Sequence, residues 1–117
     1  MDRYEIYCDL RTGVRDLDLV AALRAYLDRL VGRGVLESWR LTRRKLGFGI
    51  DGLGEFHLTL DVRDLAQLDA AFNLVATRDG EVETLHSAVF SRVTNARFAL
   101  YRDFPDPVRA EARTPTP

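Results

Sequence analysis

The sequence has few of the features that mark a secreted or membrane protein. Its single cysteine, Cys8, cannot form an internal disulfide, so a reducing compartment is the default expectation. No stretch approaches the run of ~18 apolar residues that a membrane helix needs, and the first residues, MDRYEIYCDL, lack the basic region and apolar run of a secretion signal. We therefore expect a soluble, cytoplasmic protein with no membrane segment.

The chain also lacks a charge of one sign. Its 17 basic and 18 acidic side chains leave a formal net charge of −1. Because nucleic-acid-binding domains are usually strongly basic, this balance argues against DNA or RNA as a partner. The one basic cluster, Arg40 with Arg43, Arg44 and Lys45, is interpreted as a charged sheet edge or as a set of ion-pair donors across a dimer.

Motifs for metals, cofactors and nucleophiles are missing as well. The two histidines, His57 and His86, have no cysteine near them, which argues against a zinc site. No Gly-x-Ser-x-Gly motif occurs. Residues 47–52, GFGIDG, match G-x-G-x-x-G, but they lead into a predicted strand and not into the helix that would hold a pyrophosphate. No metal or cofactor is predicted, and the glycines are interpreted as a wide hairpin connection.

The composition is that of an ordinary folded domain. The 117 residues, 46% apolar and 30% charged, suffice for one domain with one core. After Phe104 the chain becomes polar and contains all four of its prolines. We predict a single domain over residues 1–104 and a flexible tail over 105–117.

Hydrophobic periodicity predicts the elements along the chain. Apolar residues alternate in 3–10 and 55–62, as in strands with one buried face. They recur at helical spacing after Asp16, including Leu17, and after Asp64, where Gln67 completes a capping-box pattern. The predicted order is strand 3–10, helix 16–32, strand 35–46, strand 55–62, helix 65–79, short helix 82–93 and strand 95–104.

This order predicts the α+β class with a ferredoxin-like βαββαβ arrangement and an extra short helix before the last strand. Right-handed crossovers then give an antiparallel four-stranded sheet of order 4-1-3-2 with both main helices on one face. In this element order and in the strand GVLESWRLTRRKLG after the first helix, the chain resembles the dimeric α+β barrel superfamily. That superfamily includes small cofactor-free monooxygenases and muconolactone isomerases. The resemblance implies a homodimer with a pocket for a small organic molecule.

The sheet face without helices must be solvated or covered by something else. It combines ionisable and aromatic side chains, and we interpret it as a dimer interface with a pocket; an ordinary solvated sheet face is the alternative. Which side of strand 35–46 joins this face stays open. A non-catalytic dimerisation module is the alternative function.

His57 is the candidate catalytic residue on this open face. It lies mid-strand, and imidazole suits proton transfer near neutral pH; a structural histidine in an interfacial hydrogen-bond network is the alternative. The side chains expected to line a pocket around it are Tyr7, Asp9, Glu55, Thr59, Arg97 and Tyr101. His86 is interpreted as the flank of a buried helical stripe, and Cys8 as a buried packing thiol.

Overall fold

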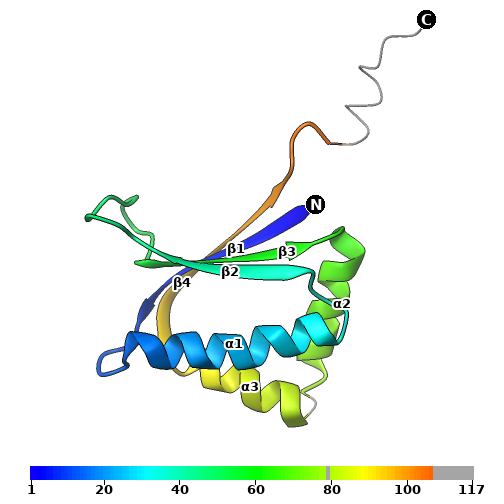
Figure 1. Ribbon diagram of the computed structural model, residues 1–117, viewed down its shortest axis with the longest axis horizontal. Coiled ribbons are helices and arrows are strands. Elements are labelled where there is room, and N and C mark those ends of the chain that lie inside the picture. Colours follow the sequence, from blue (N-terminus) through cyan, green and yellow to red (C-terminus); the bar gives the residue numbers. More distant parts are fainter. Residues whose placement is uncertain (79, 107–117) are drawn as a thin grey trace, which may run out of the picture.

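The structure, a computed structural model, describes residues 1–78 and 80–106. The elements follow the predicted order, and the strands form one antiparallel sheet of order β2-β3-β1-β4. The α+β class and the ferredoxin-like arrangement are thus confirmed (Figure 1). The elements are β1 (Asp2–Leu10), α1 (Asp16–Gly32), β2 (Ser38–Arg43), β3 (Phe56–Val62), α2 (Leu65–Ala76), α3 (Gly80–Phe90) and β4 (Val93–Arg102). Most of the tail predicted over 105–117 lies outside the described residues.

The three helices of the described part of the chain lie on one side of the sheet, and none of its helices covers the other side (Figure 1). The core between the layers is built from the inward positions of β1 and β3, among them Cys8, Phe56, Leu58 and Val62, each at most 6% exposed. This arrangement follows from the period-2 alternation, which places every second side chain on the helix face.

Helix α1 buries the apolar stripe predicted from its periodicity, except that Leu19 takes the place of Leu17 at the start of the helix. Leu19, Leu23, Leu27 and Leu30 are all buried, whereas Leu17 is 75% exposed. The N-cap is Arg15 and not Asp16. Asp16 stands in the first turn, where its negative charge faces the positive end of the helix dipole.

At the start of α2 the N-cap hydrogen bond of the predicted capping box is present, and the reciprocal bond goes to the residue before the N-cap. Asp64 accepts a hydrogen bond from the backbone N–H of Gln67 at 2.9 Å. The Gln67 side chain accepts one in return from the backbone N–H of Arg63 at 2.7 Å. Its amide also donates to the carbonyl of Gly34 at 3.1 Å, which ties α2 to the segment that follows α1.

Strand β2 is an edge strand and is shorter than predicted. It ends at Arg43, and residues 44–55 form the long connection to β3 that projects from the body in Figure 1. Leu46, Phe48 and Ile50 in this connection are more than 70% exposed. The face of β2 that the sequence left open is also settled: Trp39 turns toward the helices and donates to Asp28 of α1 at 2.8 Å.

Among the helices that the structure describes, none has the length and apolar character needed to cross a bilayer.

Candidate functional site

The open sheet face carries a hydrogen-bonded cluster around His57. The Nε2 atom of His57 lies 2.5 Å from Oε2 of Glu5, and the Thr59 hydroxyl donates to the same oxygen at 2.7 Å. Because an ionised carboxylate can only accept, His57 carries its proton on Nε2 in this arrangement. The Tyr7 ring stacks on the imidazole with a centroid distance of 4.3 Å. Burial raises the pKa of Tyr7, and the charge of Glu5 adds to this shift.

Register explains why these side chains meet. Tyr7 pairs with His57 and Glu5 pairs with Thr59 across β1 and β3, so all four stand on the same face. Glu5 reaches His57 along the diagonal of this four-residue set. It is only 8% exposed although no helix covers it, because its neighbours surround it.

Asp9 and Glu55 lie at the end of the same two strands but take other partners. Asp9 accepts from the backbone N–H of Glu55 at 2.8 Å and from Asn95 at 3.1 Å. These hydrogen bonds, the Glu55 N–H first, lower the pKa of Asp9. The Glu55 side chain turns to Arg43, with an Arg43 nitrogen 3.0 Å from its carboxylate.

Arg97 and Tyr101 lie on the open face of β4 at different distances from His57. Arg97 pairs with Tyr7 in the register and so flanks the cluster. Tyr101 pairs with Arg3 at the far end of β1 and is 61% exposed. The structure thus places Tyr7 and Thr59 next to His57, Arg97 on the far side of Tyr7, and Tyr101 farther along β4.

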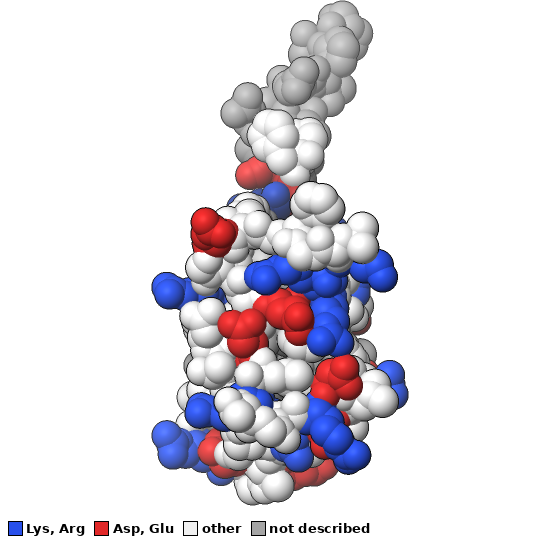
Figure 2. Space-filling view, turned by 90° about the vertical axis from the view of Figure 1, so that its left-hand side faces the viewer, with Lys and Arg blue, Asp and Glu red and all other residues white. Residues whose placement is uncertain are grey.

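Charges of both signs are intermixed on the surface. Figure 2 shows acidic and basic side chains alternating on one side of the molecule. On the open face, Arg3 contacts Asp61 at 2.5 Å, and Ser38 donates to the same carboxylate at 2.6 Å. Within the basic cluster of β2, Arg43 forms ion pairs with Asp16 and Glu55.

A cavity of about 320 Å³ lies on the opposite side of the sheet from His57, between the sheet and the helices. Apolar side chains from β1, α1, β3, α2, α3 and β4 form nearly all of its wall. Phe72, Phe90 and Phe98 both line the cavity and are about half exposed, so they mark its opening. The volume is at the lower end of the range of roughly 300–1,000 Å³ typical of small-molecule sites.

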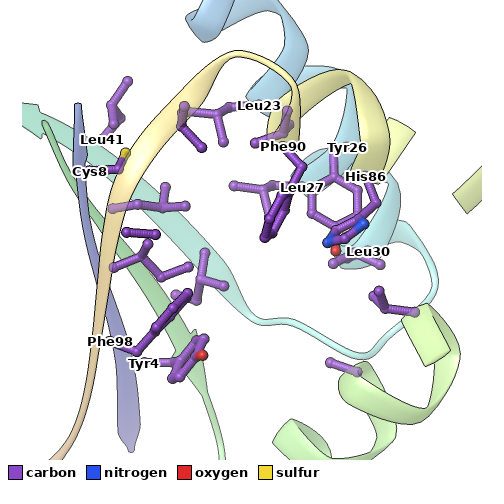
Figure 3. A pocket seen from close by; sticks show the side chains of 18 of the residues that line it. Tyr4, Cys8, Leu23, Tyr26, Leu27, Leu30, Leu41, His86, Phe90 and Phe98 are labelled. Atoms are coloured by element: carbon purple, nitrogen blue, oxygen red, sulfur yellow. The ribbon is translucent and has the colours of Figure 1, made fainter. Parts of the chain in front are cut away.

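Four of the lining residues have a polar atom: Tyr4, Cys8, Tyr26 and His86. Figure 3 shows Tyr26 and His86 on the helix wall and Tyr4 with Phe98 on the sheet wall. Burial raises the pKa of Cys8 to about 11 and the pKa of Tyr26 to about 12. The predicted buried thiol is therefore confirmed at Cys8, which is 6% exposed.

Sequence reasoning missed Glu5 as the partner of His57 and missed Tyr26 and His86 as cavity residues. The register of two strands with the same open face contained the signal for Glu5. Helical spacing placed His86 on the inner flank of α3. It could not reveal that α1 and α3 stand far enough from the sheet to leave a cavity.

Within residues 1–78 and 80–106, no group of three or more His, Cys, Asp or Glu side chains is arranged to hold a metal ion.

Solved structures with this fold come from several organisms. Protein At3g17210 from Arabidopsis thaliana matches with a TM-score of 0.67 and 9% identity over 88% of this chain and 95% of its own. A dimeric ferredoxin-like protein of unknown function from Jannaschia sp. CCS1 matches with a TM-score of 0.64 and 10% identity, over 87% and 98%. A similarly described protein from Thermobifida fusca gives 0.59 and 12%, over 87% and 90%.

These identities support a shared fold and no more. No curated protein matches the sequence. The profile of one family, described as a family of unknown function (DUF6614), matches residues 1–114. Since that match spans nearly the whole chain, the protein belongs to this family.

Proposed function

We propose that the protein is a homodimer that binds a small, mainly apolar organic molecule in the cavity between its sheet and its helices. The cavity is the observation that carries this proposal. Apolar side chains dominate its wall, and its opening is formed by three half-exposed phenylalanines. Binding an apolar molecule there removes apolar surface from water at both the ligand and the wall.

The homodimer is proposed to form through the open sheet face. Similar folds in Jannaschia and Thermobifida are described as dimeric, and no helix within residues 1–78 and 80–106 covers this face. Its Glu5–His57–Thr59 cluster satisfies its own hydrogen bonds, so packing a second sheet on it would leave no buried carboxylate without a partner.

The predicted pocket beside His57 stays part of this proposal as a site between protomers. Within one chain, Tyr7, Thr59 and Arg97 flank His57 on a flat sheet, and only a partner's sheet could close a pocket over them. Asp9, Glu55 and Tyr101 would lie at its rim. The expected cytoplasmic location likewise stays a prediction from the sequence.

A non-catalytic dimerisation module is the second candidate function. The observation that favours it is the same cluster: Glu5 accepts from both His57 and Thr59, as in a structural hydrogen-bond network. In this case the open face would hold the dimer together and the cavity would bind nothing.

Filling the cavity tests the first proposal against the second. Ala71 of α2 lines the cavity, whereas its neighbour Ala70 is exposed. We expect Ala71→Phe to abolish binding of naphthalene, measured by fluorescence titration, and Ala70→Phe to leave it unchanged. Equal naphthalene binding by both variants, or no binding by the unmodified protein, would contradict the proposal and favour the module.

A further inference from the structure

We propose that the ligand of the cavity carries an uncharged hydroxyl group, that Tyr26 and His86 bind this group, and that the ligand's flat apolar body lies toward Tyr4 and Phe98. This inference rests on the proposed function, because it concerns the same cavity. It names the class of ligand: a small neutral phenol or aromatic alcohol.

The polar end of the cavity is built by two helices. Tyr26 projects from α1 and His86 from α3, and their ring centroids are 5.6 Å apart. His86 also contacts Phe90 at 5.0 Å, which places it near the opening. In Figure 3 the Tyr26 oxygen and the imidazole nitrogens stand close together on the helix wall.

These polar atoms need a hydrogen-bond partner. Among the described residues, neither Tyr26 nor His86 has a side-chain hydrogen bond to the protein. A polar group in an apolar cavity without such a bond costs free energy, which water or a ligand group must offset. Tyrosine and neutral histidine together offer donors and acceptors, as a hydroxyl group does in return.

The surrounding charges favour a neutral ligand over an anion. No arginine or lysine among residues 1–78 and 80–106 lines the cavity, so a carboxylate would lose its hydration without gaining a fixed cation from these residues. Burial, and then the negative charge of Glu83, raise the pKa of Tyr26 to about 12. Tyr26 is therefore a neutral hydroxyl at physiological pH, and the nearby acid adds to the disadvantage of an anionic ligand.

Aromatic rings at the sheet side indicate the shape of the ligand's body. Tyr4 stacks on Phe98 with an interplanar angle of 16° and a centroid distance of 5.9 Å. It also meets Phe72 edge-on at 5.4 Å. Rings in such arrangements accept a further flat ring by offset stacking or edge contact.

Three probes of similar shape separate the contributions of the apolar body, a hydroxyl group and a negative charge to binding: naphthalene, 2-naphthol and 2-naphthoate. We expect 2-naphthol to bind about tenfold more tightly than naphthalene, the size of effect of one or two net hydrogen bonds, and 2-naphthoate to bind most weakly. Tyr26→Phe and His86→Phe should each reduce the preference for 2-naphthol severalfold and leave naphthalene binding unchanged. As a control, Thr84→Val removes a hydroxyl from the exposed side of α3. It should change neither the preference for 2-naphthol nor the affinity for naphthalene.

The outcomes distinguish this inference from the proposed function. Equal affinity for naphthalene and 2-naphthol, or a preference that survives both substitutions, overturns the inference and leaves apolar binding intact. If 2-naphthoate binds most tightly of the three, the proposal of an uncharged ligand is wrong, and a charged His86 is indicated. If none of the three probes binds, the proposed function itself fails and the inference fails with it.

Discussion

The His57 imidazole is hydrogen-bonded to a buried carboxylate. Glu5 is 8% exposed and accepts from His57 and Thr59. Removing one donor leaves this carboxylate partly unsatisfied, so we expect His57→Ala to lower the free energy of unfolding by about 1–3 kcal/mol. His57→Gln, which keeps a donor, should lose less.

Urea denaturation of the two His57 variants provides the measurement. An alanine variant as stable as the original would mean that Glu5 does not depend on His57. A variant that keeps its stability but loses binding of a ligand would instead support the catalytic or ligand-anchoring role predicted for His57 from the sequence.

Asp9 makes stability depend on acid pH. The backbone N–H of Glu55, and then Asn95, lower the pKa of Asp9 below its unfolded value of about 3.9. Its contribution is therefore present above that value and is lost as pH falls through the lower, folded pKa. We expect Asp9→Asn to lower stability by about 1 kcal/mol at pH 7 and to flatten the loss of stability below pH ~4.

Thermal unfolding between pH 7 and pH 2 tests this dependence. Thr94→Val, a change next to Asn95 on β4 that leaves Asp9 and both of its donors in place, should keep the acid dependence of the original. Identical acid profiles for Asp9→Asn and the original protein would contradict the assignment.

At the scale of the elements, the segment entering β3 passes closely over β1. A Cβ atom on Gly54 would collide with the backbone of Cys8, whereas one on Gly49 would meet only the flexible side chain of Arg44. We expect Gly54→Ala to cost about 2 kcal/mol of stability, as overpacking does, and Gly49→Ala to cost less than about 0.5 kcal/mol. Similar melting temperatures for the two variants would mean that β1 and this segment separate readily.

Hydrophobic periodicity predicted the helices and strands well where a single pattern determined which side chains are buried. The alternation in β1 and β3 gave the buried face, because a strand exposes every second side chain. In α1 it misplaced only the first position of the buried stripe, because Leu17 and Leu19 both fit an apolar stripe and packing against the sheet selected Leu19. In β2 the end was misplaced, since the basic residues after Arg43 belong to the connection and no local signal marked the boundary.

The site was less predictable because it depends on distances between layers. The open-face cluster follows from strand register, and the sequence therefore located Tyr7, His57 and Thr59 on one face. The cavity depends on how far α1 and α3 stand from the sheet, which no single segment encodes. His86 consequently read as packing, although it lines the cavity with Tyr26.

For the whole molecule, a dimer through the open face predicts a specific charge effect. Arg97 is exposed beside Tyr7, and none of the described residues forms an ion pair with it. We expect light scattering to give twice the 13.3 kDa of one chain. Arg97→Glu would place a new negative charge beside the Glu5 cluster. We therefore expect the dissociation constant of the dimer to rise at least tenfold, which corresponds to about 1.4 kcal/mol of binding free energy.

Arg24→Glu, on the exposed side of α1, is the matched control and should remain dimeric. A mass of one chain for the original protein at micromolar concentration would contradict the dimer. Dissociation of the Arg24 variant alone would place the interface on the helices.

A crystal structure of the protein soaked with naphthalene tests most directly whether the cavity binds a small apolar molecule. We expect ligand density between the sheet and the helices, enclosed by Leu23, Leu58 and Phe98, with the ring near Tyr4. Density beside His57 between two sheets, with none between the sheet and the helices, would contradict the assignment of the cavity as the binding site. A cavity closed by the chain's own side chains, with no density in it, would contradict small-molecule binding there altogether.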